Sequence, residues 1–268
     1  MWQIKSLYFY VRSFTSMNIY NQLLKTIEKK GAAYLILLDP DKLNSDKLDV
    51  FIKKCNDADV DGFLIGGSLM LNGDFDGFIK RVKQSTNLPT IIFPGAINQV
   101  SSYADAILFL SVVSGRNPEH LIGKHVLAAP LIRRANLEPI STAYILVESG
   151  TQTTAQYMSG SLPIPRNKPE IAAATALASE YIGMKLIYLE AGSGAQQTVP
   201  NEMVKAVSSI CSVPVIVGGG IKSPKVAREK VDNGAKIIVT GNFFENENNW
   251  SLIKEFADAV HKKISITA

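Results

Sequence analysis

Cysteine and histidine are scarce in this sequence of 268 residues. Its two cysteines, Cys55 and Cys211, lie far apart and belong to no CxxC motif. The three histidines, His120, His125 and His261, lack the spacing of metal ligands. This distribution argues against a disulfide-stabilised scaffold and against a zinc site. Because unpaired cysteines are typical of a reducing compartment, the sequence predicts a cytoplasmic protein.

Long apolar runs and a strong net charge are also missing. No stretch approaches the roughly 20 apolar residues of a membrane-spanning helix, and the aromatic first segment has no small-residue cleavage site. The net charge of +4 is dispersed, which argues against nucleic-acid binding and permits a small anionic substrate. We predict no transmembrane segment, an N-terminal appendage over residues 1–16, Met17 as an alternative start, and a single domain over residues 17–268.

Short apolar runs rich in Val, Ile and Leu dominate the sequence, each followed by turn residues and then by a segment of helical periodicity. Such runs suit strands buried on both faces of a parallel sheet. Eight β/α units in this length predict an α/β fold, a TIM (β/α)8 barrel. A doubly wound sheet is the alternative, but "DPDK" stands where its glycine fingerprint would follow the first strand. The eight runs span residues 34–39, 62–67, 89–95, 105–111, 142–148, 185–192, 214–220 and 236–242.

Two segments between the runs carry clear helix signals. Residues 45–55 place apolar side chains on one helical face, and residues 168–183 begin near a proline and end at a glycine. Residues 149–167 have no regular pattern and are too long for a simple connection. In a barrel this segment would lie over the mouth as a lid or as a wall for the substrate.

Glycine-rich loops follow the last two predicted strands. "GGGIKSP" contains Gly219 and Gly220, and "GNFFE" contains Gly241 and Asn242. Backbone N–H groups without obstructing side chains can hold a phosphate, and this fold commonly binds phosphate after strands seven and eight. Tight turns alone would also explain the glycines. The pairing of two such loops favours a phosphate site.

Tyr188 and Glu190 end the sixth predicted strand in "YLEAGSG". They are two residues apart, so both side chains point to the same side of the strand. Glu190 could accept a proton from a hydroxyl group that Tyr188 binds or orients. The alternative is that Glu190 pairs with a lysine and that Tyr188 only caps the barrel core. The glycines that follow favour the catalytic interpretation.

Asp39 ends the first predicted strand, and Ser68 follows the second. Neighbouring strand ends bring the carboxylate and the hydroxyl together, and Mg²⁺ prefers such oxygen ligands beside substrate phosphates. "DPD" is equally a turn and helix-start motif, so a structural role stays open. Arg116, in "SGRNP" after the fourth strand, is a further candidate for contact with a diphosphate.

The motifs together resemble those of the geranylgeranylglyceryl phosphate synthase family. The resemblance extends from about Tyr34 to Asn242 and includes "LLDPDK", "GFLIGGS", "LPTIIFPG", "LFLSVVSGRNP", "TAYILVESG", "YLEAGSG", "VGGGI" and "VTGN" in the family's order. It is closest to the branch with "YLEAGSG". Another branch has a lysine directly before "LDPD", where this sequence has Leu37. The contact that this lysine makes in the other branch is therefore not expected here.

This resemblance implies a Mg²⁺-dependent TIM-barrel prenyltransferase. Such enzymes join an isoprenoid diphosphate, here expected to be geranylgeranyl diphosphate, to the terminal hydroxyl of sn-glycerol 1-phosphate. Asp39 and Ser68 would contact the Mg²⁺, and Glu190 and Tyr188, the catalytic pair indicated by their position at the end of the sixth strand, would be among the contacts of the acceptor. Transient membrane contact of the product and a homo-oligomer are also expected. The implied contacts of sn-glycerol 1-phosphate are Tyr188, Leu189, Glu190, Ala191, Gly192, Ser193, Gly194, Gly219, Gly220, Gly241 and Asn242.

Two rival functions share the glycine loops. One is a phosphate-binding barrel of sugar-phosphate, histidine or thiamine-precursor metabolism, which would need no groove for a prenyl chain. The other is a phosphoglycerol-binding barrel without catalysis, which would need no base. The sequence does not fix the length of the prenyl chain, because groove depth depends on side chains from several helices.

Overall fold

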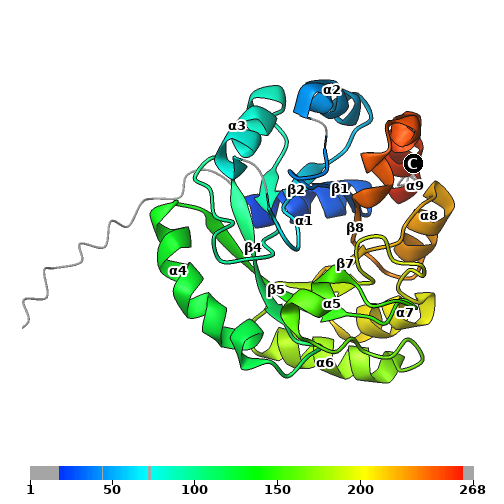
Figure 1. The fold of residues 1–268 in the computed structure, drawn as a ribbon. Coiled ribbons are helices and arrows are strands. Elements are labelled where there is room, and N and C mark those ends of the chain that lie inside the picture. The colour runs from blue at the N-terminus through cyan, green and yellow to red at the C-terminus, as the bar shows by residue number, and fades with distance from the viewer. Residues whose placement is uncertain (1–17, 44, 72–73, 262–268) are drawn as a thin grey trace, which may run out of the picture.

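A closed barrel of eight parallel strands forms the centre of the computed structural model, which describes residues 18–43, 45–71 and 74–261 (Figure 1). Each strand pairs with its neighbours in sequence order, and β8 closes the barrel against β1. The predicted TIM barrel is confirmed. The strands are β1 (Ala33–Leu38), β2 (Gly62–Ile65), β3 (Thr90–Ile92), β4 (Ala106–Val112), β5 (Glu138–Leu146), β6 (Leu186–Glu190), β7 (Val215–Gly218) and β8 (Ile237–Thr240).

Helices surround the barrel as an outer layer (Figure 1). The two predicted helices are confirmed, with the first beginning as a 3-10 turn. The α-helices are α1 (Ile19–Lys30), α2 (Leu48–Asp57), α3 (Phe75–Ser85), α4 (Lys124–Arg134), α5 (Thr154–Ser159), α6 (Pro169–Tyr181), α7 (Asn201–Ile210), α8 (Pro224–Asp232) and α9 (Ile253–Val260). Shorter helical segments are η1 (Ser45–Lys47), η2 (Glu119–Gly123), η3 (Asn242–Glu245) and η4 (Glu247–Leu252).

The connection between β3 and β4 departs from the predicted β/α alternation. Residues 93–105 contain turns but no helix. The sequence there, "FPGAINQVSSYAD", has Pro94 and Gly95 directly after the strand and polar residues such as Asn98, Ser101 and Ser102 beyond them, which favour turns. The outer side of the barrel is therefore less covered between α3 and α4.

Alternate side chains of the strands enter two separate cores. In β4, Ala106 and Leu108 belong to the core inside the barrel, whereas Ile107 belongs to the core between the strands and the helices. This follows from the two-residue period of a strand that is buried on both faces. Consequently, only one of each pair of neighbouring residues at a strand end can face the barrel mouth.

Helix α1 lies at the amino-terminal end of the barrel. The Ile19 N–H donates to Glu138 Oε2 at the start of β5 (2.6 Å), and Leu23 is buried against the inner core. The opposite, carboxyl-terminal end remains open for a site. Among the described residues, no helix is both long and apolar enough to cross a lipid bilayer.

Candidate active site

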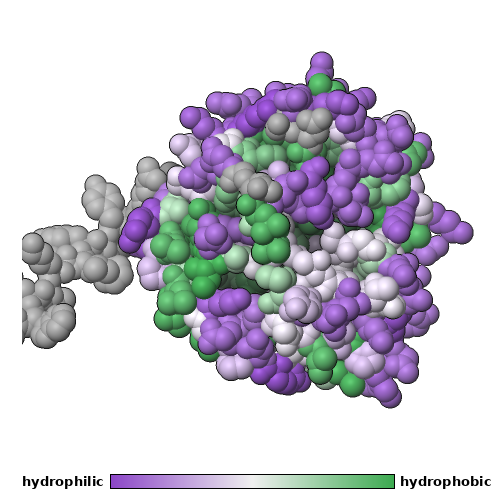
Figure 2. All heavy atoms as spheres, viewed as in Figure 1, coloured by the Kyte–Doolittle hydropathy of each residue, from purple (hydrophilic) through white to green (hydrophobic). Residues whose placement is uncertain are grey.

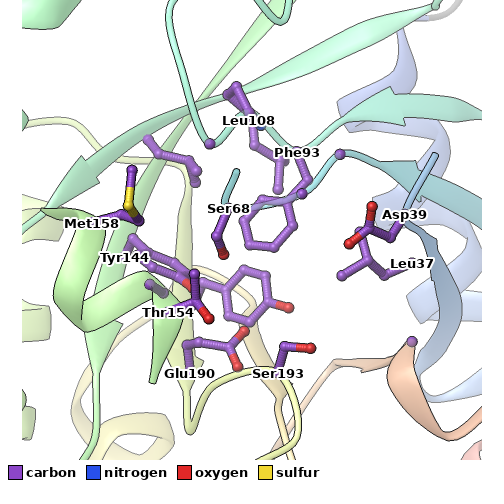
Figure 3. Close-up of a pocket in the computed structure, with 18 of the residues that line it drawn as sticks. Leu37, Asp39, Ser68, Phe93, Leu108, Tyr144, Thr154, Met158, Glu190 and Ser193 are labelled. Atoms are coloured by element: carbon purple, nitrogen blue, oxygen red, sulfur yellow. The ribbon is translucent and has the colours of Figure 1, made fainter. Parts of the chain in front are cut away.

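A cavity of about 410 Å³ opens at the carboxyl ends of the strands. Figure 3 shows Asp39 on one side of it, Met158 on the opposite side and the Phe93 ring between them. The predicted lid segment, residues 149–167, contains α5 and contributes Thr154 and Met158 to the wall. Most of the residues predicted from the sequence line this cavity: Asp39, Ser68, Tyr188, Glu190, Ser193, Gly194, Gly219, Gly220, Gly241 and Asn242.

Three predicted binding residues do not line the cavity. Leu189 and Ala191 alternate with Tyr188 and Glu190, so their side chains lie in the core between the strands and the helices. The Ala191 N–H also donates to the Gly218 carbonyl (3.1 Å). Any role of these two residues in binding would therefore involve peptide groups rather than side chains. The third residue, Gly192, donates its N–H to the Glu190 carboxylate.

Glu190 is the most perturbed carboxyl group of the site. Its side chain is buried, with the residue 6% exposed, and its Oε1 accepts a hydrogen bond from the Gly192 N–H (2.5 Å). Burial raises the pKa of Glu190 to about 7, although the Gly192 N–H and the Tyr188 hydroxyl act in the opposite direction. Among the described residues it forms no ion pair with a lysine, so the structural alternative for Glu190 is wrong. A carboxyl group with such a pKa can exchange a proton near neutral pH.

Tyr188 belongs to a group of three rings in the barrel interior. Its ring stacks on Phe93, with centroids 5.3 Å apart, and meets the edge of Tyr144 at 5.4 Å. Tyr188 is fully buried in the inner core and still lines the cavity, so it also has the structural role that we considered as the alternative. Burial, followed by the charge of Glu190, raises the pKa of Tyr188, which keeps its hydroxyl protonated as a donor.

The glycine loops bring backbone close to Glu190. Gly219 and Gly220 have φ angles of +86° and +70°, which side-chain-bearing residues rarely adopt. A Cβ on Gly219 would lie 2.5 Å from Glu190 Oε1, and one on Gly220 would lie 3.1 Å from the Ala195 carbonyl oxygen. Both positions therefore require glycine for conformation and for space. We call the lining residues after β6, β7 and β8 the glycine arm: Ser193, Gly194, Gly219, Gly220, Gly241 and Asn242.

Asp39 and Ser68 lie beside the glycine arm at the ends of β1 and β2. The Asp39 side chain is 15% exposed, its Oδ1 accepts from the Asp41 N–H (3.1 Å), and its Oδ2 is 3.4 Å from Lys42 Nζ. The turn that we considered as the alternative is therefore present, and the carboxylate faces the cavity as well. Among the described residues, no three carboxylate, histidine or cysteine side chains form a metal cluster. A carboxylate at the edge of the cavity is a ligand that a Mg²⁺ ion can take together with water and phosphate oxygens.

The other end of the cavity is apolar. It lies where the helix after β3 is missing, between the outer face of β4 and α4. We call its lining residues the apolar arm: Ile97, Val100, Ile107, Phe109, Ala128 and Ile132. His125 stands in the same wall, buried against Phe109, with its Nε2 3.1 Å from Ser111 Oγ. Burial lowers the pKa of His125, which favours the neutral form of its imidazole.

Several cavity residues were missed from the sequence. Lys42 and Lys222 occur within the quoted motifs "LLDPDK" and "GGGIKSP", which could have identified them. His120 and Lys124 also line the cavity, and no spacing signal marked them. Arg116, by contrast, does not line the cavity: its Nη1 donates to the carbonyls of Val113 and Gly115. The predicted diphosphate contact of Arg116 has no support in this arrangement.

The fold and the cavity define a class of protein, an enzyme of the TIM-barrel type with its site at the carboxyl ends of the strands. The chain belongs to the PcrB family, whose model matches residues 24–260. The family resemblance inferred from the sequence is thereby confirmed.

Relatives and solved structures agree with this assignment. The geranylgeranylglyceryl phosphate synthase of Chitinophaga pinensis is 46% identical, with 91% of this chain and 96% of the relative covered. The enzyme of the same name from Pyrococcus horikoshii is 40% identical, covering 90% and 94%. The crystal structure of (S)-3-O-geranylgeranylglyceryl phosphate synthase from Thermoplasma acidophilum, solved with its substrate sn-glycerol-1-phosphate, superposes with a TM-score of 0.86 at 30% identity, covering 92% of this chain and 99% of that one.

Proposed function

We propose that this protein is a prenyltransferase that joins geranylgeranyl diphosphate to the terminal hydroxyl of sn-glycerol 1-phosphate. The observation that carries the proposal is one cavity in which the glycine arm and Glu190 are continuous with the apolar arm. A phosphorylated acceptor needs the first environment, and a long isoprenoid chain needs the second. The names of the relatives, and the glycerol phosphate in the Thermoplasma acidophilum structure, agree with this pair of substrates.

The glycine arm holds the acceptor in this proposal. Backbone N–H groups after β7 and β8, together with the Lys222 ammonium, bind the phosphate of sn-glycerol 1-phosphate. The glycerol then extends toward Glu190 and Tyr188, which line the same cavity. Fixing the phosphate places the free hydroxyl near the reacting carbon, so an encounter between two molecules becomes a positioned step.

Glu190 acts as the general base. As the bond between the allylic carbon and the diphosphate oxygen breaks, a bond forms between that carbon and the hydroxyl oxygen of glycerol. The hydroxyl proton passes to the Glu190 carboxylate, and diphosphate leaves with the electron pair of the broken bond. The pKa of about 7 suits this task, because the carboxylate is basic enough to take the proton and is still ionised in part at neutral pH.

Asp39 and Ser68 would hold the Mg²⁺ ion. When bound there, the ion neutralises the negative charge that develops on the leaving diphosphate. The Lys42 ammonium, 3.4 Å from Asp39 Oδ2 and 3.5 Å from Glu245 Oε1, lies at the same edge of the cavity and adds positive charge for the diphosphate.

Binding of a homo-oligomeric partner and a cytoplasmic location stay predictions from the sequence.

The apolar arm distinguishes this proposal from its rivals. Barrels that act on small sugar phosphates or on thiamine precursors have no chain to place between β4 and α4. A barrel that only binds phosphoglycerol has no need for a buried carboxyl group with a raised pKa beside the acceptor. The combination of the two features is what a prenyl transfer requires.

Incubation of the purified protein with radiolabelled sn-glycerol 1-phosphate and a ladder of prenyl diphosphates tests the proposal. We expect a labelled prenylglyceryl phosphate, with the highest turnover for geranylgeranyl diphosphate and much lower turnover when glycerol replaces its phosphate. Absence of any prenylated product across the ladder would refute the proposed function.

Removal of the divalent ion tests the role of Asp39. Excess chelator should abolish turnover, and Asp39→Ala should lower it by about 10²–10³-fold, the typical cost of losing a group that stabilises charge in the transition state. The matched control is Asp49→Ala, because Asp49 is paired with Arg81 on the outer helices. Full activity of Asp39→Ala, or in the presence of chelator, would contradict the metal site.

A further inference from the structure

A carboxylate on the polar edge of the cavity has no role in the reaction described above. Figure 2 shows apolar residues on one side of the hollow and more hydrophilic residues on the other. Among the described residues that line the cavity, three are acidic: Asp39, Glu190 and Glu245. The first two are assigned to the metal ion and to the proton. Because like charges repel, Glu245 should weaken the binding of two phosphorylated substrates unless its contacts offset that cost.

The contacts of Glu245 join two sides of the site. Glu245 ends η3, a 3-10 helix in which residues three apart lie on the same side. Its Oε2 accepts a hydrogen bond from Nδ2 of Asn242, the first residue of η3 (2.7 Å). Its Oε1 lies 3.5 Å from the Lys42 ammonium, which also lies 3.4 Å from Asp39 Oδ2. One carboxylate thus contacts a residue of the glycine arm and the lysine beside the proposed metal ligand.

The hydrogen bond from Asn242 decides which way its amide faces. A carboxylate has only acceptor atoms, so the amide nitrogen of Asn242 must point to Glu245. The amide oxygen then lies toward the loop after β6, since a Cβ built on Gly194 would lie 3.9 Å from Asn242 Oδ1. The Asn242 side chain therefore spans from Glu245 to that loop. Its orientation affects how the loops after β6 and β8 face each other in the glycine arm.

The backbone of η3 is held independently of Glu245. Asn249 Nδ2 donates to the Phe243 carbonyl (2.7 Å). Trp250 Nε1 donates to the Phe244 carbonyl (2.9 Å). The Glu245 side chain itself is 25% exposed, so its truncation leaves no void in a packed core. A substitution of Glu245 should therefore release the amide at the start of η3 and leave the turn folded.

We propose that Glu245 is a positioning residue for the phosphorylated acceptor. The inference deepens the proposed function and rests on it, because the glycine arm is the acceptor site of that function. Glu245 fixes the Asn242 amide, so the glycine arm is ordered before the acceptor binds and less ordering is needed on binding. Lys42 supplies the counter-charge that offsets the repulsion between this carboxylate and the anionic substrates.

Calorimetric titration with sn-glycerol 1-phosphate separates positioning from charge. Loss of a carboxylate alone would strengthen the binding of an anion, because a repulsion is removed. Glu245→Ala should instead weaken binding by about tenfold, as for the loss of one charge-assisted hydrogen bond. Glu245→Gln also removes the charge but keeps an oxygen that can accept from Asn242 Nδ2, so its affinity should be within about twofold of the wild type or higher.

The matched control is Glu247→Ala. This variant loses the same charge two residues further along, but Glu247 pairs with Lys47 (2.6 Å) and does not line the cavity. It should bind the acceptor as the wild type does. In steady-state turnover, Glu245→Ala should raise the KM for sn-glycerol 1-phosphate about tenfold and leave the turnover number within about twofold of the wild type.

Unchanged or tighter binding in Glu245→Ala would overturn the proposal. An equal loss of affinity in Glu245→Gln would also overturn it, because the charge rather than the bond to Asn242 would then be responsible. An equal loss in Glu247→Ala would overturn it in favour of the net charge of the protein.

Product formation separates this inference from the proposed function. A wild type that binds sn-glycerol 1-phosphate but forms no prenylated product would refute the proposed function, while the measured affinities still decide on Glu245. A wild type that does not bind sn-glycerol 1-phosphate would overturn both.

Discussion

The glycine arm and the apolar arm of the cavity are built in opposite ways. The glycine arm consists of backbone at conformations such as φ +70° at Gly220, held against a buried carboxyl group. The apolar arm consists of side chains from β4, α4 and the connection between β3 and β4, exposed to the cavity because no helix follows β3. One arm recognises charge through fixed N–H groups, and the other accepts any chain of suitable length and shape. Substitutions should therefore separate acceptor chemistry from donor selection.

The largest effect is expected for Glu190→Gln. This change keeps the shape and the hydrogen-bonding capacity of the side chain but removes the base, so turnover should fall by about 10²–10⁴-fold. Affinity for sn-glycerol 1-phosphate should be nearly normal in calorimetry. A decrease of turnover smaller than about tenfold would show that Glu190 is not the base. A parallel loss of affinity would instead assign Glu190 to binding of the glycerol hydroxyls.

The pH dependence of turnover should reveal the same group. Because burial raises the pKa of Glu190 to about 7, the carboxyl group is mostly protonated at pH 5 and becomes an active base as the pH rises. Turnover at saturating substrate should therefore rise by about fiftyfold between pH 5 and pH 7, and by about another twofold before it levels off above about pH 8. A profile that is already flat from pH 5 upward would contradict an elevated pKa in the enzyme.

Donor selection should change in Ala128→Phe. Ala128 faces the apolar arm from α4, so a phenyl ring there would shorten the space for the chain. We expect turnover of geranylgeranyl diphosphate to fall by about 10–100-fold, in line with the usual cost of a misfit in an apolar pocket. Turnover of geranyl diphosphate should stay within about twofold of the wild type, measured on the donor ladder. An equal loss of turnover with both donors would show that the apolar arm does not select the length of the prenyl chain.

A smaller effect, confined to the acceptor, is expected for Gly220→Ala. The added Cβ would lie 3.1 Å from the Ala195 carbonyl oxygen, at a φ of +70°, and would push the loop away from the phosphate. The KM for sn-glycerol 1-phosphate should rise about tenfold, as for one weakened charge-assisted hydrogen bond, with little change in the donor KM. The matched control is Gly183→Ala, which has a φ of +93° but no atom within 4 Å of the added Cβ. A similar rise in the control would attribute the effect to backbone strain alone.

Much of the site could be predicted because local patterns specify it. The apolar runs identified eight strands, and the parallel barrel then required that Asp39, Ser68, Glu190 and the glycine loops meet at one end. The alternation along β6 correctly placed Tyr188 and Glu190 on one side. The same alternation, applied to the full motif, would have turned Leu189 and Ala191 away from the cavity.

The sequence by itself determined the barrel, the family and the polar end of the cavity, because hydrophobic period, turn glycines and motif order are properties of short segments. Only the tertiary structure decided three features: the burial of Glu190, the hydrogen bond from the Gly192 N–H to the Glu190 carboxylate, and the apolar arm beside α4. These features arise where segments distant in sequence meet. A carboxyl pKa depends on which groups exclude water from it, and a groove depends on which helix is absent beside it, so neither can be read from one segment.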